Sequence, residues 1–232
     1  MPVYRLTEEM TFPHPAHAAP DGLLAVGGDL SPDRLLLAYR LGIFPWYSEG
    51  LPILWWSPDP RLVLDPQELR VSRRLRQLLK KGVFRVTFDQ AFASVIHACA
   101  SVPRREQDGT WITLEMEQAY IRLHELGYAH SAESWRDGRL VGGLYGVSLG
   151  KCFFGESMFH HETDASKAAF ATLARQLKNW GFQMIDAQVT TRHLLSLGAK
   201  EVPRTVFLKK LADALVFPTV KGKWDADVED WY

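Results

Sequence analysis

The chain has 232 residues, 47% of them hydrophobic, and its 27 Lys and Arg residues balance its 27 Asp and Glu residues. Such a length allows one large domain or two smaller ones, and it buries roughly 70% of the surface of the unfolded chain. The formal net charge of zero excludes a basic or acidic field over the whole chain, so an anionic partner has to meet a local group of cations.

The two cysteines, Cys99 and Cys152, lie in apolar surroundings without metal-ligand spacing, which predicts buried free thiols in a reducing compartment. The N-terminus lacks the apolar core of a signal peptide, and no apolar run approaches the ~20 residues that span a bilayer. We therefore expect a cytoplasmic protein, monomeric and without a membrane partner.

The first part of the chain predicts a small N-terminal domain, residues 1–62. Residues 1–20 are rich in Pro, His and Ala and predict an extended lead-in. Ser31 and Pro32 then start a helix that ends at Leu41, before Gly42. Aromatic residues follow among prolines and glycines. These aromatic residues are Phe44, Trp46, Tyr47, Trp55 and Trp56. Most of them are expected in the core of this domain, although Trp rings also stack well on nucleobases.

From residue 63 on, regular patterns predict a second domain, residues 63–232. A strand at 62–64 precedes a basic helix that Ser72 caps and Gly82 ends. A strand at 84–88 then leads to a helix that Asp89 caps and to a helix that Thr113 caps. Between Arg70 and Arg105, nine cations stand against the single acid Asp89, which predicts a local basic surface rather than an ordinary mixed helix face.

The stretch 129–188 predicts one folding unit. Two strands, 129–135 and 139–148, flank an Asp-Gly pair typical of a hairpin turn, and a third strand covers 151–159. A helix capped by Asp164 or Ser166 and a strand at 182–188 complete the unit. Beyond it we expect a short helix capped by Thr190 or Thr191, a strand near 201–202, a helix over 205–215, and a tail that is a surface strap or partly disordered.

Asp186 and Gln188 are the most informative polar residues of this unit. They are two apart in a predicted strand, so their side chains are expected on one face, in line with Met184. A carboxylate beside a carboxamide can hold an amine and a carbonyl together, although a single Asp at a strand end is more often simply solvated.

Three other motifs do not support a site. Ser148, Asp186 and His193 follow the order of a hydrolase triad, but the glycines around Ser148 lead into a strand, whereas a nucleophile elbow leads into a helix. His160 and His161 are adjacent and point in opposite directions on an extended chain. No nucleotide-binding glycine loop is present. We therefore expect neither a metal nor a cofactor.

Strand, strand, helix and strand in this order resemble the core of the GNAT-type acetyltransferase fold, so we expect an α+β chain with a small N-terminal α/β domain and a GNAT-like domain whose mixed sheet is flanked by helices. The glycine-rich pyrophosphate loop of such enzymes is missing, because residues 160–164 fill its place. This departure argues against a coenzyme A donor.

Longer motifs extend the resemblance. Residues 21–30 (DGLLAVGGDL), 42–46 (GIFPW), 55–61 (WWSPDPR), 155–159 (GESMF) and 186–188 (DAQ) make the chain resemble the bacterial leucyl/phenylalanyl-tRNA–protein transferase family over nearly its whole length. The resemblance implies transfer of Leu or Phe, and less well Met, from aminoacyl-tRNA to proteins with N-terminal Arg or Lys, which marks them for N-degron degradation. Ala187 stands where members often carry Cys, so no thiol nucleophile is required there.

The resemblance also implies roles for individual residues. Asp186 would help to deprotonate the incoming α-ammonium group, Gln188 would orient the amine or carbonyl, and Glu156 would sit beside the aminoacyl group. Trp46 and Trp111 would stack on the terminal adenosine. The apolar pocket would be lined by Leu144, Phe153, Met158, Leu173 and Ile185. The phosphates of the acceptor stem would be contacted by Arg73, Arg74, Arg76, Lys80 and Lys81.

Two alternatives stay open from the residues. A coenzyme A-dependent N-acetyltransferase would bind acetyl-CoA tightly. A non-catalytic tRNA-binding module would use Asp186 and Gln188 only for stability. Which residue is the formal base is not decided by the sequence.

Overall fold

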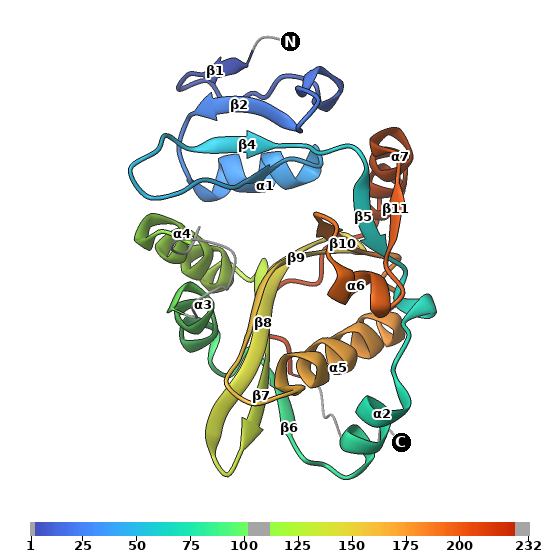
Figure 1. Cartoon of the computed structure of the whole chain (residues 1–232). Coiled ribbons are helices and arrows are strands. Elements are labelled where there is room, and N and C mark those ends of the chain that lie inside the picture. Colours follow the sequence, from blue (N-terminus) through green and yellow to red (C-terminus); the bar gives the residue numbers. More distant parts are fainter. Residues whose placement is uncertain (1–2, 102–111, 226–232) are drawn as a thin grey trace.

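The computed structural model describes residues 3–101 and 112–225 and contains two β-sheets with helices packed around them (Figure 1). The first sheet has the strand order β1-β2-β4-β3, and the second has the order β11-β5-β10-β9-β8-β7-β6. The strands of the first sheet are β1 (Tyr4–Leu6), β2 (Leu23–Gly27), β3 (Phe44–Pro45) and β4 (Leu54–Trp56). Those of the second are β5 (Arg61–Leu64), β6 (Arg85–Phe88), β7 (Ala129–Arg136), β8 (Arg139–Leu149), β9 (Cys152–His160), β10 (Met184–Gln188) and β11 (Lys200–Val202).

The helices begin close to the residues that the sequence indicates. The described α-helices are α1 (Pro32–Arg40), α2 (Arg73–Lys80), α3 (Phe92–Ser101), α4 (Leu114–Glu125), α5 (Ala165–Asn179), α6 (Arg192–Ser196) and α7 (Arg204–Leu215). Side-chain caps are confirmed at Ser31, Ser72, Thr113 and Thr191, where the hydroxyl oxygen accepts a backbone N–H of the first turn. None of these helices is long and apolar enough to cross a membrane.

The N-terminal lead-in is more ordered than expected. Its residues Tyr4–Leu6 form β1, which pairs in parallel with β2, and a 3-10 helix spans Pro15–His17. Buried Arg34 of α1 fastens this segment, because its guanidinium donates to the carbonyl oxygens of Thr7 (3.0 Å) and Glu9 (3.2 Å). The sequence pattern missed β1 because the strand has only three residues, fewer than an alternating pattern needs.

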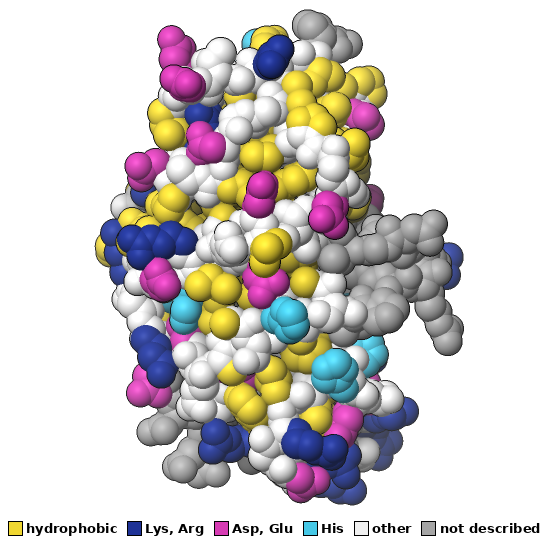
Figure 2. Space-filling view, turned by 90° about the vertical axis from the view of Figure 1, so that its left-hand side faces the viewer, with side chains coloured by type: hydrophobic (Ala, Val, Ile, Leu, Met, Phe, Trp, Pro, Cys, Tyr) yellow, Lys and Arg dark blue, Asp and Glu magenta, His cyan; other side chains and the backbone are white. Residues whose placement is uncertain are grey.

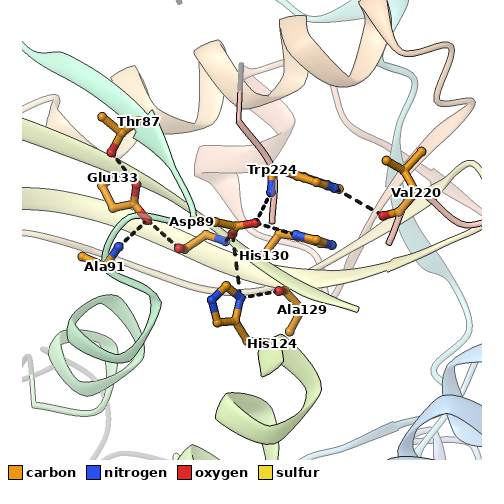
Figure 3. Close-up of polar contacts among 10 residues, drawn as sticks. Thr87, Asp89, Ala91, His124, Ala129, His130, Glu133, Val220 and Trp224 are labelled. Carbon is orange, nitrogen blue, oxygen red and sulfur yellow. Dashed lines mark hydrogen bonds and ion pairs between the residues drawn. The ribbon is translucent and has the colours of Figure 1, made fainter. Parts of the chain in front are cut away.

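Asp89 does not cap α3, contrary to the sequence prediction (Figure 3). It has a positive φ of 53°, and its buried carboxylate accepts hydrogen bonds from the backbone N–H of Ser131 (2.8 Å), from Nδ1 of His130 (2.8 Å) and from the backbone N–H of Trp224 (2.7 Å). Glu133 meets the start of α3 instead, because its Oε1 accepts the N–H of Ala91 at 3.4 Å.

The same contacts correct the prediction for the C-terminal tail. Trp224 is only 2% exposed, and its ring stacks on His130 with centroids 3.7 Å apart. Trp180 and Phe182 also pack against it, so this part of the tail belongs to the core. Residues 226–232 lie outside the described residues.

Asp164 precedes α5 as expected but makes no side-chain cap, because it adopts a left-handed conformation with φ 69°. Its carboxylate instead contacts Lys167 (3.0 Å) and Arg74 of α2 (3.2 Å). The contact ties the basic helix α2 to the start of α5.

The predicted hairpin of β7 and β8 is confirmed, with Asp137 at φ 51° and Gly138 at φ 73° in its turn. Ser148 is fully buried in β8 and is followed by a strand, so it is not the nucleophile of an elbow. Cys99 and Cys152 are both buried, as predicted.

The pairing of β9 with β10 positions the site. These strands run parallel and are joined by α5, and their paired register runs from Met184 opposite Cys152 to Asp186 opposite Phe154. The residues that follow on both strands, from Gly155 and from Ala187, line a cavity. The two central strands therefore stop pairing beyond Phe154 and Asp186, and the cavity lies at this point of the sheet.

Candidate active site

A cavity of about 440 Å³ lies where the ladder of β9 and β10 ends. Its walls come from β3, β8, β9, α5, β10 and α6, so both sheets contribute to it. In Figure 1, α6 and the strands β9 and β10 lie below the first sheet. The size is that of a site for a small molecule or for one end of a larger one.

The apolar wall of the cavity contains three of the five side chains that the sequence predicted there. Leu144, Met158 and Ile185 line the cavity, together with Phe170, which was not predicted. Phe153 and Leu173 do not line it, although they belong to the hydrophobic cluster that also contains Leu144 and Ile185. They therefore pack behind the wall. Phe170 and Leu173 lie on the same helix, α5, so the sequence pattern could not show which of them faces the cavity.

Glu156 is the polar centre of the cavity. Its Oε1 accepts a hydrogen bond from Nε2 of Gln188 at 2.9 Å, and its Oε2 accepts one from the hydroxyl of Tyr120 at 3.0 Å. The hydroxyl of Tyr120 also contacts that of Tyr39, which comes from α1. A chain of hydrogen bonds thus connects the first part of the chain to Glu156.

Burial raises the pKa of Glu156 to about 7, against the opposing effect of the hydrogen bonds from Tyr39, Tyr120 and Gln188. The negative charge of Asp186 adds to the increase. Burial, followed by the charge of Glu156, raises the pKa of both tyrosines well above its usual value, so they remain hydrogen-bond donors at neutral pH. A carboxyl group that titrates near neutrality can accept a proton from an amine.

Asp186 lies beside this centre but faces a different partner. It is fully buried, and its Oδ1 and Oδ2 accept hydrogen bonds from Nε (2.8 Å) and Nη2 (2.7 Å) of Arg61. Its Oδ1 also accepts the backbone N–H of Gln188 at 2.9 Å. Asp186 does not line the cavity, so its carboxylate acts on the cavity through its neighbours.

Gln188 lines the cavity and Asp186 does not, contrary to the prediction that both side chains lie on one face of the strand. The register of β10 against β5 shifts between these two residues, and Gln188 has a positive φ of 60°. Simple strand alternation therefore does not place Gln188. The hydrogen bonds of its backbone to Asp186 and of its side chain to Glu156 fix its position.

Trp46 lines the cavity and is partly exposed, with its ring 5.8 Å from that of Trp56. An accessible indole at the mouth of a cavity can stack on a nucleobase. Trp111, the second predicted adenosine contact, lies outside the described residues.

The predicted basic surface lies on and directly after α2. Its five side chains, Arg73, Arg74, Arg76, Lys80 and Lys81, are all exposed. Figure 2 shows the side of the molecule away from α2, and there Lys and Arg side chains are scattered among acidic ones. A contact with nucleic acid phosphates would therefore be local, as the neutral composition indicates.

Several residues of the site were missed by the sequence reasoning. Arg61 belongs to the motif at residues 55–61, but the sequence indicated no role for it. Tyr39 and Tyr120 lie on helices, and the sequence cannot show which polar groups they contact. His193 of α6 lines the cavity, and burial, followed by the charges of Lys167 and His160, lowers its pKa. Within residues 3–101 and 112–225, no three His, Cys, Asp or Glu side chains are grouped to hold a metal ion.

Comparison with known proteins gives a family. The model of the "Leucyl/phenylalanyl-tRNA protein transferase" family matches residues 63–212, and that of its N-terminal domain matches residues 28–59. Relatives named leucyl/phenylalanyl-tRNA–protein transferase include one from Syntrophobacter fumaroxidans, 60% identical over 98% of this chain and 97% of the relative. Another, from Desulfatibacillum aliphaticivorans, is 58% identical over 99% of both chains.

Among solved structures, a functionally unknown conserved protein from Staphylococcus epidermidis covers 78% of this chain and 68% of its own, with 11% identity and a TM-score of 0.44. A likeness this low does not define the fold. The family models and the relatives agree over nearly the whole length, and the chain therefore belongs to the leucyl/phenylalanyl-tRNA protein transferase family.

Proposed function

We propose that this chain is an aminoacyltransferase that moves Leu or Phe, and less well Met, from aminoacyl-tRNA to the α-amino group of a protein whose N-terminus is Arg or Lys. The observation that carries the proposal is the identity of 57–60% to relatives named for this reaction, over at least 98% of the chain. The product would be marked for degradation through the N-degron pathway in the cytoplasm.

The chemistry needs little activation of the donor, because an aminoacyl ester is already reactive. The amine of the acceptor has to lose a proton and approach the ester carbonyl in a fixed orientation. Its nitrogen forms a bond to the carbonyl carbon, the ester C–O bond breaks, and the ribose oxygen of the terminal adenosine takes up a proton. The chain therefore needs a proton acceptor, an orienting group and an apolar pocket.

The cavity supports these three roles. We assign proton acceptance to Glu156, because its pKa of about 7 matches the working pH of a general base. Gln188, hydrogen-bonded to Glu156, would orient the amine or the carbonyl. The family resemblance implied that Asp186 helps to deprotonate the amine and left the formal base open. Because both carboxylate oxygens of Asp186 accept hydrogen bonds from Arg61, we assign Asp186 an indirect role.

Recognition of the donor would use the rest of the cavity and α2. Leu144, Met158, Phe170 and Ile185 would receive the apolar side chain of Leu or Phe. Trp46 would stack on the terminal adenosine. The exposed cations of α2 would contact phosphates of the acceptor stem without reading sequence.

The proposal extends to the domains, to the fold of the second domain and to the monomeric state of the chain. A division into two domains is supported by the two sheets, because the strands up to Trp56 belong to the first sheet and those from Arg61 on belong to the second. The change of sheet lies before β5, so the boundary that the sequence suggested at 62/63 moves to the segment before Arg61. A GNAT-like arrangement of the second domain is supported by the parallel strands β9 and β10, which α5 joins and whose ladder ends at the cavity. The monomeric state stays a prediction.

The direct test is transfer of labelled Phe from Phe-tRNA to peptides that begin with Lys, Arg or Ala, with acetyl-CoA as a parallel donor. We expect transfer only from the tRNA and only to the basic N-termini. Acetyl transfer, or tRNA binding without any transfer, would contradict the proposal. Glu156→Gln should lower kcat about 10²- to 10⁴-fold, whereas Glu115→Gln, a change of an exposed carboxyl on α4, should not.

A further inference from the structure

Arg61 is the first residue of β5, and its environment is unusual for a charged side chain. It is fully buried, and its guanidinium lies over the ring of Phe44 at 4.8 Å from the centroid and over that of Phe207 at 4.5 Å. Phe44 comes from β3 of the first sheet and Phe207 from α7, so two separate elements cover the guanidinium. A buried arginine is held in this way only when its geometry is fixed by a partner.

Asp186 is that partner. Two parallel hydrogen bonds, of 2.8 and 2.7 Å, join the guanidinium to both carboxylate oxygens. This two-point contact fixes the carboxylate in orientation as well as in distance. A lysine, with a single ammonium group, could supply the charge but not the orientation.

The fixed carboxylate in turn fixes Gln188. Oδ1 of Asp186 accepts the backbone N–H of Gln188 at 2.9 Å, at the point where the register of β10 shifts and Gln188 adopts its positive φ of 60°. A side chain other than glycine adopts this conformation only where its surroundings hold it. From this position, Nε2 of Gln188 donates to Glu156 at 2.9 Å.

We propose that Arg61 is a positioning residue of the transfer reaction, which acts through Asp186 to hold the Gln188 carboxamide beside Glu156 in the cavity. The inference rests on the proposed function, because it assigns Arg61 a part in that reaction. Arg61 is not among the described residues that line the cavity, so its effect is on geometry and charge rather than on the substrate.

The pair also acts on the charge at Glu156. The groups that face Glu156 are Tyr39 from α1, Tyr120 from α4, and Gln188 and Asp186 from β10. Tyr145 of β8 and His193 of α6 line the same cavity. Asp186 raises the pKa of Glu156, and Arg61 balances the charge of Asp186. Loss of the Arg61 charge should therefore move the pKa of Glu156 further upward.

The test uses two substitutions in the full chain, Arg61→Lys and Arg61→Met, with Phe-tRNA and a peptide that begins with Arg. Arg34→Lys is the matched control, because Arg34 is also fully buried and paired with an aspartate, Asp29, but lies away from the cavity. Fold and stability are measured for each variant by circular dichroism and urea unfolding, and kcat and KM are measured across a range of pH.

Arg61→Lys should keep the fold and the KM for Phe-tRNA, but lower kcat about ten- to hundredfold, because a small displacement of a positioned group has an effect of this size. Arg61→Met should move the midpoint of the pH profile of kcat to higher pH. Arg34→Lys should lower stability while leaving kcat unchanged.

A folded Arg61→Lys variant with the kcat of the wild type at every pH would overturn the positioning role, and this variant decides the question if Arg61→Met fails to fold. If the wild type is active and Arg61→Lys has the same kcat, only the role of Arg61 is refuted, and the proposed function stands. A wild-type chain that transfers nothing from Phe-tRNA removes the proposed function, and the role of Arg61 with it.

Discussion

Replacement of Glu156 by Gln should raise the free energy of unfolding relative to the wild type, and this gain should be larger at alkaline pH than at acidic pH. The carboxyl group of Glu156 has its pKa raised from 4.5 to about 7 by burial. Between these two pH values the folded chain binds more protons than the unfolded chain, so the wild type loses stability as the pH rises through this window. Gln does not ionise and is free of this loss. Its carboxamide oxygen can still accept from Gln188.

The size of the effect follows from the pKa difference. A change from 4.5 to about 7 corresponds to roughly 3 kcal/mol between the two protonation states, at 1.36 kcal/mol for each pKa unit. Part of this change in the free energy of unfolding occurs below about pH 5, and Glu156 keeps some contact with the solvent in the cavity. We therefore expect about 2 kcal/mol between about pH 5 and about pH 8.

Urea unfolding measures this difference directly. The free energy of unfolding is determined for the wild type and for Glu156→Gln at both pH values, and the change in the difference between the two proteins is the quantity of interest. Glu115→Gln serves as the control, since the side chain of Glu115 is exposed on α4. A difference between Glu156→Gln and the wild type that is the same at both pH values would refute the reasoning, because Glu156 would then not titrate in this range.

Three further predictions concern other parts of the molecule. Trp224→Ala should lower the free energy of unfolding by about 3–5 kcal/mol, whereas Val220→Ala, at a residue 37% exposed, should change it little; equal losses in urea unfolding would contradict the buried role of Trp224. Lys80→Glu combined with Lys81→Glu should weaken binding of all tRNAs alike and lower the salt dependence by about 1 for each lysine, and unchanged affinity at low salt would exclude α2 as the contact. Trp46→Ala should weaken binding of an aminoacyl-adenosine by about 1–3 kcal/mol in calorimetry, and undiminished binding would exclude stacking.

The elements of this chain follow closely from local sequence. Ser31, Ser72 and Thr113 cap helices where the sequence places them, because a cap depends on residues within one helical turn. The hairpin of β7 and β8 and the order of strand, helix and strand up to Gln188 are likewise local features. The long motifs also gave the family, because they extend over nearly the whole length.

Local patterns failed where a distant partner decides the conformation. Asp89 resembles a helix cap in sequence, yet it binds His130 and the backbone of Trp224, more than a hundred residues further along the chain. The tail resembles a polar strap, yet the single ring of Trp224 brings it into the core. At Asp89, the buried long-range contacts outweigh a capping preference that is worth only about 1 kcal/mol.

The sequence by itself determined the helices, the strands of the second sheet, the family and the residue types of the candidate site, because these depend on short-range patterns and on motifs. Only the tertiary structure decided which carboxylate faces the cavity. Asp186 and Glu156 are both acids on strands, but Arg61 neutralises the first from a strand 125 residues away in sequence, while Tyr120 and Gln188 hold the second at the cavity wall. The charge and the pKa of a carboxyl group depend on such partners and on its burial, and neither is set by the residue's neighbours in the chain.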